Sequence, residues 1–139
     1  MSTRTKTMVD MKIIELGFLA IGGVLGTFLR YKLFTAPLYL GALQANVLMV
    51  NVVGSFILGA FAVATQQWSL DGKYALLVAF GFCGSLTTMS ALAYDTSDLI
   101  TGTKYGLMMV NVVANLALSV AAIFAGKALL SAVVGNHSI

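Results

Sequence analysis

The sequence predicts an all-α integral membrane protein with four transmembrane helices, and three observations support this. First, 59% of the 139 residues are hydrophobic and only 9% are charged. Soluble domains carry about 25% charged residues, so this chain cannot cover a surface in water. Second, four apolar stretches each approach the ~20 residues that a helix needs to cross a bilayer. Third, lipid forces backbone polar groups to bond internally, which favours helices.

The four stretches leave no room for a second domain. They are expected at residues 13–29, 40–65, 74–94 and 105–130, which form one transmembrane domain over residues 13–130. Residues 1–12 are expected to form an N-terminal tail, and residues 131–139 a C-terminal tail. Aromatic side chains lie at several ends of the stretches, as is typical of the membrane interface: Tyr31, Tyr39, Trp68, Tyr74, Tyr94 and Tyr105.

The loop charges give little preference for one membrane orientation. With four spans, both termini and the loop between the second and third spans share one side, which carries Arg4, Lys6, Lys12, Lys73 and Lys127. The other side carries Arg30, Lys32 and Lys104. Without the two most distant N-terminal cations the sides are equal, which favours insertion in both orientations and an antiparallel homodimer. The alternative is that Arg4 and Lys6 fix a single orientation.

The first stretch carries small residues at helical spacing. Gly22 and Gly26 form a small-xxx-small pair, which lets helix backbones approach closely in lipid. The contact lies either within one subunit or at a dimer face. Arg30 follows on the same face, where it reaches the interface with its long side chain or attracts an anion toward a pore mouth.

Neutral amides and hydroxyls occur inside the second and fourth stretches. Asn51 lies near the middle of its helix, where its amide either bonds a neighbouring helix or donates to a passing anion. Asn111, Asn115 and Ser119 are spaced by four, so they share one helix face. We interpret this stripe as a polar track along a pore, with interhelical hydrogen bonds as the alternative.

The third stretch contains a segment rich in glycine and hydroxyl side chains, from Gly81 to Ser90. We expect a helix break over Gly81–Thr88, because irregular backbone at membrane depth persists only inside protein or around a cavity or ion. Thr88, Leu92 and Asp95 follow on roughly one face. An ionisable group such as Asp95 near a membrane span is a functional hypothesis by default.

The chemistry of these residues indicates transport rather than catalysis. The sequence has no carboxylate pair within the spans, no Ser/His/Asp set and no Cys/His metal spacing. Its single cysteine, Cys83, is expected to be a small packed residue. Neutral donors suit a small hydrated anion, because they replace water without trapping the ion on a fixed charge. Scattered basic residues predict no nucleic-acid partner.

Motifs in three of the stretches resemble the small Fluc (CrcB-type) fluoride channels, and the likeness extends over all four spans. They are Gly22-Gly23-x-x-Gly26-x-x-x-Arg30, Asn51-x-x-Gly54-Ser55-Phe56-x-x-Gly59 and Gly81-Phe82-Cys83-Gly84-x-Leu86-Thr87-Thr88-x-Ser90. The resemblance implies passive fluoride export across the cell membrane by an antiparallel dual-topology dimer with two pores. It also implies a structural sodium ion at the dimer axis, held by the carbonyls of Gly84 and Thr87. The implied anion path involves Arg30, Asn51, Thr88, Met89, Ser90, Leu92, Asp95, Asn111, Asn115 and Ser119.

The sequence departs from this family at several path positions. The family usually has two phenylalanines where this chain has Met89 and Leu92, and neither replacement offers a positive ring edge to an anion. The family's Gly-Thr pair in the second helix is Asn46-Val47 here. The chain is therefore a homodimeric channel with an altered pore, a subunit of a heterodimeric channel, or a relative with another substrate.

Two functions from other classes are also consistent with four short spans. A small dual-topology drug or guanidinium exporter needs a carboxylate deep in its first helix, whereas Glu15 lies near the start of that helix. The other alternative is a membrane assembly protein that transports nothing.

Overall fold

The computed structural model describes residues 3–41 and 43–135. Four helical segments are long and apolar enough to cross a membrane: Lys12–Thr35, Asn46–Trp68, Gly72–Thr101 and Tyr105–Gly135. The prediction of an all-α membrane fold with four spans is confirmed. The helices are α1 (Thr3–Thr35), α2 (Asn46–Trp68), α3 (Gly72–Ala75), the π-helix η1 (Leu76–Cys83), α4 (Gly84–Leu86), α5 (Met89–Thr101) and α6 (Tyr105–Gly135).

The ends of the helices differ from the sequence expectation at three places. α1 already begins at Thr3, so most of the expected N-terminal tail continues the first helix. The strands β1 (Tyr39–Leu40) and β2 (Leu43–Gln44) form an antiparallel hairpin where the second span is expected to begin. The φ of 62° at Gly41 suits a residue without a side chain. α6 runs to Gly135, and residues 136–139 of the expected C-terminal tail lie outside the described residues.

Local capping explains where several helices start and stop. α1 ends shortly before Pro37, and a proline disfavours helical backbone in the residue before it. α2 ends where Ser69 adopts a left-handed conformation with φ of 46°. Asp71 caps α3 by accepting from the Lys73 N–H at 3.0 Å, and this hydrogen bond lowers the pKa of the Asp71 carboxyl.

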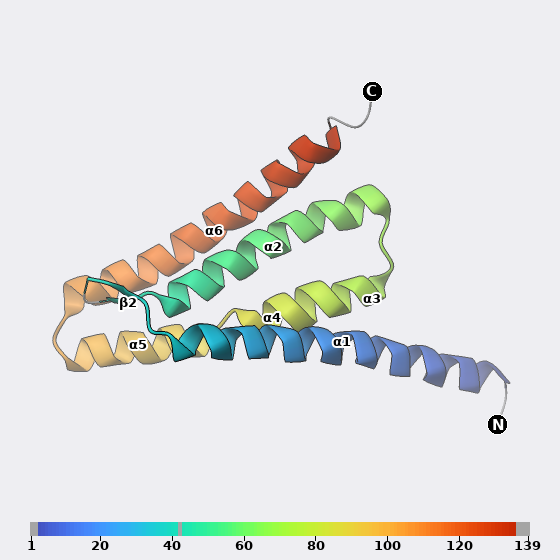
Figure 1. The fold of residues 1–139 in the computed structure, drawn as a ribbon, viewed down its shortest axis with the longest axis horizontal. Coiled ribbons are helices and arrows are strands. Elements are labelled where there is room, and N and C mark those ends of the chain that lie inside the picture. The colour runs from blue at the N-terminus through green and yellow to red at the C-terminus, as the bar shows by residue number, and fades with distance from the viewer. Residues whose placement is uncertain (1–2, 42, 136–139) are drawn as a thin grey trace.

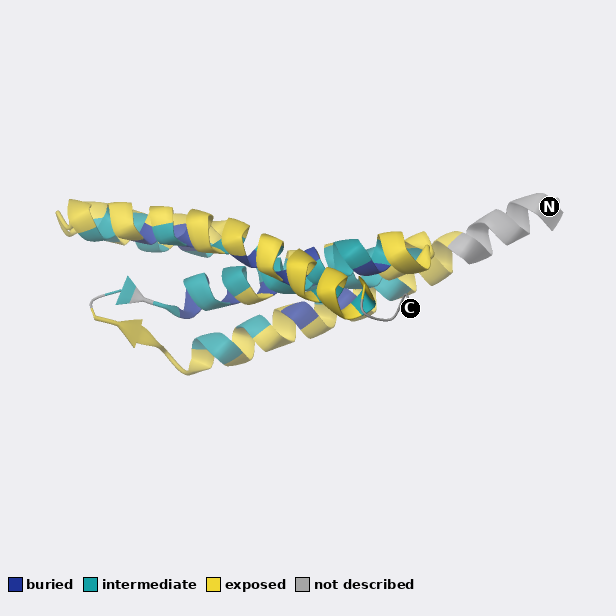
Figure 2. Ribbon diagram, turned by 90° about the horizontal axis from the view of Figure 1, so that it is seen from above, coloured by how far each residue is buried: buried dark blue, intermediate teal, exposed yellow. Residues whose placement is uncertain are grey.

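The spans form two helix pairs (Figure 1). α2 packs along α6, and α1 packs along η1 and α4. The start of α1 and the end of α6 lie toward the end of the molecule that carries the α2–α3 connection, while the hairpin and the α5–α6 turn lie at the opposite end. Figure 2 shows that α6 and the described part of α1 are largely exposed, and most of their exposed side chains are apolar. Such faces suit contact with lipid tails or with a second membrane protein.

The glycines of α1 make their contact within the subunit. A Cβ on Gly22 would overlap the Leu77 carbonyl and lie 2.9 Å from the Phe82 N. A Cβ on Gly26 would overlap the Phe82 carbonyl. The small-xxx-small pair therefore lets α1 and η1 approach each other closely in one chain, which decides between the two alternatives left open by the sequence.

Asn46 fastens the connection between α1 and α2. Its Oδ1 accepts from the Leu38 N–H at 2.8 Å, and its Nδ2 donates to the carbonyls of Leu33 at 2.6 Å and Ala36 at 3.0 Å. Leu33 lies in the last turn of α1, where carbonyls lack helical partners. The Asn46 side chain is fully buried, so these bonds replace the water contacts of its amide.

We expect Asn46→Ala to lower the thermal stability of the purified protein. Removing the amide takes the partner from one part-buried N–H and two part-buried carbonyls, and a fully buried group left unsatisfied costs about 1–3 kcal/mol. The measurement is the apparent melting temperature in detergent. Asn46→Asp keeps the acceptor for Leu38 but loses both donors, so its melting temperature should also fall. An unchanged melting temperature in both variants would show that the connection is held by other contacts.

Candidate functional site

The helix break in the third span is confined to Thr87 and Thr88. Thr87 has φ −72° and ψ 154°, and Thr88 has φ −151° and ψ 115°, so both are extended. The glycine-rich part of the predicted break, Gly81–Leu86, remains helical, because glycine permits other conformations without requiring them. Thr88 restarts the chain as the N-cap of α5, its Oγ1 accepting from the Ala91 N–H at 3.2 Å.

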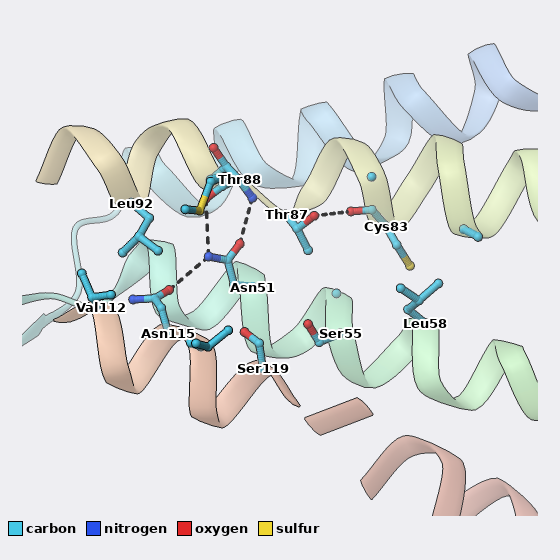
Figure 3. Close-up of a pocket in the computed structure, with 15 residues that line it drawn as sticks. Asn51, Ser55, Leu58, Cys83, Thr87, Thr88, Leu92, Val112, Asn115 and Ser119 are labelled. Atoms are coloured by element: carbon cyan, nitrogen blue, oxygen red, sulfur yellow. Dashed lines mark hydrogen bonds between the residues drawn. The ribbon is translucent and has the colours of Figure 1, made fainter. Parts of the chain in front are cut away.

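Asn51 of α2 holds the broken backbone. Its Oδ1 accepts from the Thr88 N–H at 2.8 Å, and its Nδ2 lies 3.4 Å from the Thr88 carbonyl (Figure 3). In a continuous α-helix the Thr88 N–H would bond the Gly84 carbonyl. The Asn51 side chain therefore accepts from the Thr88 N–H in place of the Gly84 carbonyl. This geometry matches the structural alternative for Asn51, a bond to a neighbouring helix.

A row of amides runs from Asn51 along α6. The Asn51 Nδ2 donates to Asn115 Oδ1 at 3.0 Å, and the Asn115 Nδ2 donates to the carbonyl and the Oδ1 of Asn111 at 3.0 and 3.2 Å. Asn115 and Asn111 are only 3% and 6% exposed. Asn111 and Asn115 thus share a face of α6, and Asn115 meets α2 through its bond to Asn51 (Figure 3).

The Thr88 N–H fixes the orientation of every amide in this row. A backbone N–H can only donate, so the oxygen of Asn51 must face it and the Asn51 nitrogen must face Asn115. Asn115 in turn directs its Nδ2 at the Asn111 Oδ1. The Nδ2 of Asn111 is buried and has no partner among the described residues. The row ends on a free N–H donor, which is the group that an anion needs.

A groove of about 420 Å³ adjoins this row (Figure 3). It is lined by α2, the broken third span and α6, and eight predicted site residues contribute to it: Asn51, Gly84, Thr87, Thr88, Met89, Leu92, Asn115 and Ser119. Met89 is 75% exposed, whereas Leu92 is 7% exposed. The Oγ of Ser119 is buried without a partner in the described part of the chain. The groove therefore combines apolar walls with a few polar groups.

A second cavity of about 230 Å³ lies at the other end of the amide row. It is lined by Tyr39, Leu43, Asp95, Asp98, Leu99, Lys104 and Asn111. The Asp95 Oδ2 is buried and, within the described residues, unpartnered. Our sequence reasoning named Asp95 and Asn111 but missed Asp98 and Lys104. Asp98 follows Asp95 by three residues and could have been found by helical spacing, whereas Lys104 reaches the cavity through a turn.

Two predicted path residues lie outside both cavities. Arg30, at the end of α1, donates from Nη1 to the Thr87 carbonyl at 3.2 Å. The Ser90 Oγ lies 3.2 Å from the Thr88 Oγ1. Both side chains therefore support the backbone break rather than line the groove.

The fold and the site define a small membrane protein with four spans and a row of buried amides beside an open groove. The family model described as CrcB-like protein, Camphor Resistance (CrcB), matches residues 17–127, and the chain belongs to this family. A protein of Nitrosopumilus maritimus named fluoride-specific ion channel FluC is 52% identical over 91% of this chain and all of its own length. Relatives with the same name from Koribacter versatilis and a Sulfurihydrogenibium species are 37% and 40% identical. Their matches cover 88% and 78% of this chain and 100% and 90% of their own lengths.

Proposed function

We propose that this chain forms a fluoride-selective channel that lets fluoride leave the cell passively. The observation that carries the proposal is the oriented amide row, which ends on the buried, unpartnered Nδ2 of Asn111. Relatives that align with nearly the whole chain are named fluoride-specific channels, which supports the same function.

Neutral donors are suited to a small anion that must pass rather than stay. Fluoride loses a tightly held hydration shell on entering a narrow path, and N–H and O–H groups replace those water contacts. A fixed cation in the path would bind the ion too tightly for release, and conduction requires both entry and exit. The apolar walls of the groove then keep bulk water away from the donors.

Met89 and Leu92 take the positions where the family usually has phenylalanine. We assign Met89 a place on the wall of the path, because it lines the groove and is 75% exposed in the single chain. Leu92 is buried and supports that wall. The same two residues favour, as a second candidate, a heterodimeric channel in which a partner subunit supplies the aromatic rings.

We further propose that two copies assemble in antiparallel orientation. The near-equal loop charges support insertion in both directions. The open groove and the exposed apolar side chains that line it support a second copy at this face: Leu58, Met89, Val112 and Leu116. An antiparallel pair would contain two equivalent paths, one on each side of its axis.

We also propose that the carbonyls at the break hold a structural sodium ion in the assembled dimer. Sodium prefers oxygen ligands, and Gly84 and Thr87 both line the groove. The Gly84 carbonyl loses its helical donor to Asn51, and the Thr87 carbonyl follows the end of α4. Two such carbonyls from each of two copies would supply four neutral oxygens. The ion would thus bind carbonyl oxygens at the helix break, which lipid cannot solvate.

Reconstitution into liposomes tests the channel directly. We expect fluoride efflux well above that of empty liposomes, measured with a fluoride electrode after an ionophore dissipates the membrane potential. Chloride-loaded liposomes should show no such efflux. If the chain alone passes no fluoride, the homodimeric channel is wrong, and flux restored by a co-reconstituted second subunit would identify the heterodimer.

A further inference from the structure

The guanidinium of Arg30 lies at the helix break. Its Nη1 donates to the Thr87 carbonyl at 3.2 Å, although the two residues are 57 positions apart. α1 reaches this point because Gly22 and Gly26 let it pack tightly on the third span. Arg30 is half-buried, so its charge is only partly solvated. The packing of α1 therefore fixes a positive charge on a particular backbone oxygen.

The Thr87 carbonyl oxygen follows the C-terminal end of a helical segment, Gly72–Leu86. Helix C-termini carry partial negative charge and carbonyls without helical donors. A carbonyl oxygen has two lone pairs, so the Arg30 bond leaves one available to a second partner. The structure places Arg30 on the oxygen that the proposed sodium ion would also use.

We propose that Arg30 is a positioning residue that shares the Thr87 carbonyl with the axial cation and sets how tightly this cation binds. The inference rests on the proposed sodium site. The Arg30 bond holds the carbonyl in place, which favours the site. Its charge, however, repels a cation bound to the same oxygen, and like charges this close interact strongly in a weakly solvated environment. Arg30 therefore makes the protein less dependent on sodium and weakens sodium binding.

A sodium titration of thermal stability separates charge from hydrogen bonding. The apparent melting temperature of the full chain in detergent is measured as sodium replaces N-methylglucamine at constant ionic strength. Arg30→Gln keeps a donor for the carbonyl but removes the charge, so its sodium midpoint should fall by about tenfold or more. Arg30→Lys keeps the positive charge near the carbonyl, so its midpoint should stay within about twofold of the wild type.

Each result decides the proposal. A sodium-dependent wild type with an unchanged or higher midpoint in Arg30→Gln overturns the role of Arg30 and leaves the sodium site standing. If the melting temperatures of the wild type, Arg30→Gln and Arg30→Lys are all independent of sodium, both the sodium site and the role of Arg30 are overturned. The channel function is tested separately by fluoride flux. If Arg30→Gln yields no folded protein, Arg30→Met, which also removes the charge, decides: a lower sodium midpoint than that of the wild type supports the proposal, and an unchanged or higher midpoint overturns it.

Discussion

Asn51→Asp should abolish most fluoride flux while changing the size of one side chain very little. The carboxylate can still accept from the Thr88 N–H, but it cannot donate to the Thr88 carbonyl or to Asn115 Oδ1. It also places a negative charge beside the groove. A unit charge about 4 Å from an anion costs roughly 4 kcal/mol at an effective dielectric of 20. We therefore expect the rate of fluoride efflux from liposomes to fall by about a hundredfold or more.

A charge added elsewhere on α2 provides the control. Gln67 is exposed near the end of α2, so Gln67→Glu adds the same charge away from the amide row and should leave efflux within about twofold. Elution of both variants as single peaks on size exclusion would separate conduction from misfolding. Unchanged flux in a well-folded Asn51→Asp variant would mean that Asn51 only holds the backbone break.

The number and placement of the spans could be predicted because hydropathy and length are properties of local sequence. The hairpin between α1 and α2 could not, because Leu40 and Leu43 are as apolar as the residues of a span. Their conformation depends on the turn at Gly41 and on the three hydrogen bonds of Asn46. The bonds of Asn46 join segments whose proximity is not visible in the sequence.

The break in the third span was predicted over a longer segment than the structure shows. Gly81 stays helical, and its small size serves a close contact: a Cβ there would lie 2.9 Å from the Leu19 carbonyl of α1. Sequence alone does not distinguish a glycine that permits contact from a glycine that permits a turn. The irregular residues are instead two threonines, whose backbone groups bond Asn51 and Arg30.

Helical periodicity predicted which face of α6 the stripe residues share, but not the direction of their hydrogen bonds: Asn111, Asn115 and Ser119. Spacing by four correctly placed these residues on one face of α6. The direction of the amide row was not predictable, because it follows from the Thr88 N–H and from the distance between α2 and α6. That distance depends on two glycines, one on each helix.

Gly59 and Gly126 let α2 and α6 touch at backbone level. A Cβ on Gly59 would overlap the Ile123 carbonyl, and a Cβ on Gly126 would overlap the Phe56 carbonyl and lie 2.9 Å from the Ala60 N. These neighbours are backbone atoms, which cannot rotate away as a side chain would. A larger residue at either position must therefore move the helices apart.

Gly126→Val should for this reason produce the largest loss of stability. Overpacking of a tight interior typically costs about 1–3 kcal/mol, and a rigid backbone contact belongs at the upper end of that range. We expect the apparent melting temperature in detergent to fall by about 5 °C or more. Gly106→Val is the matched control, because a Cβ on Gly106 of α6 meets nothing within 4 Å. Equal melting temperatures for the two variants would show that the α2–α6 crossing is looser than this structure indicates.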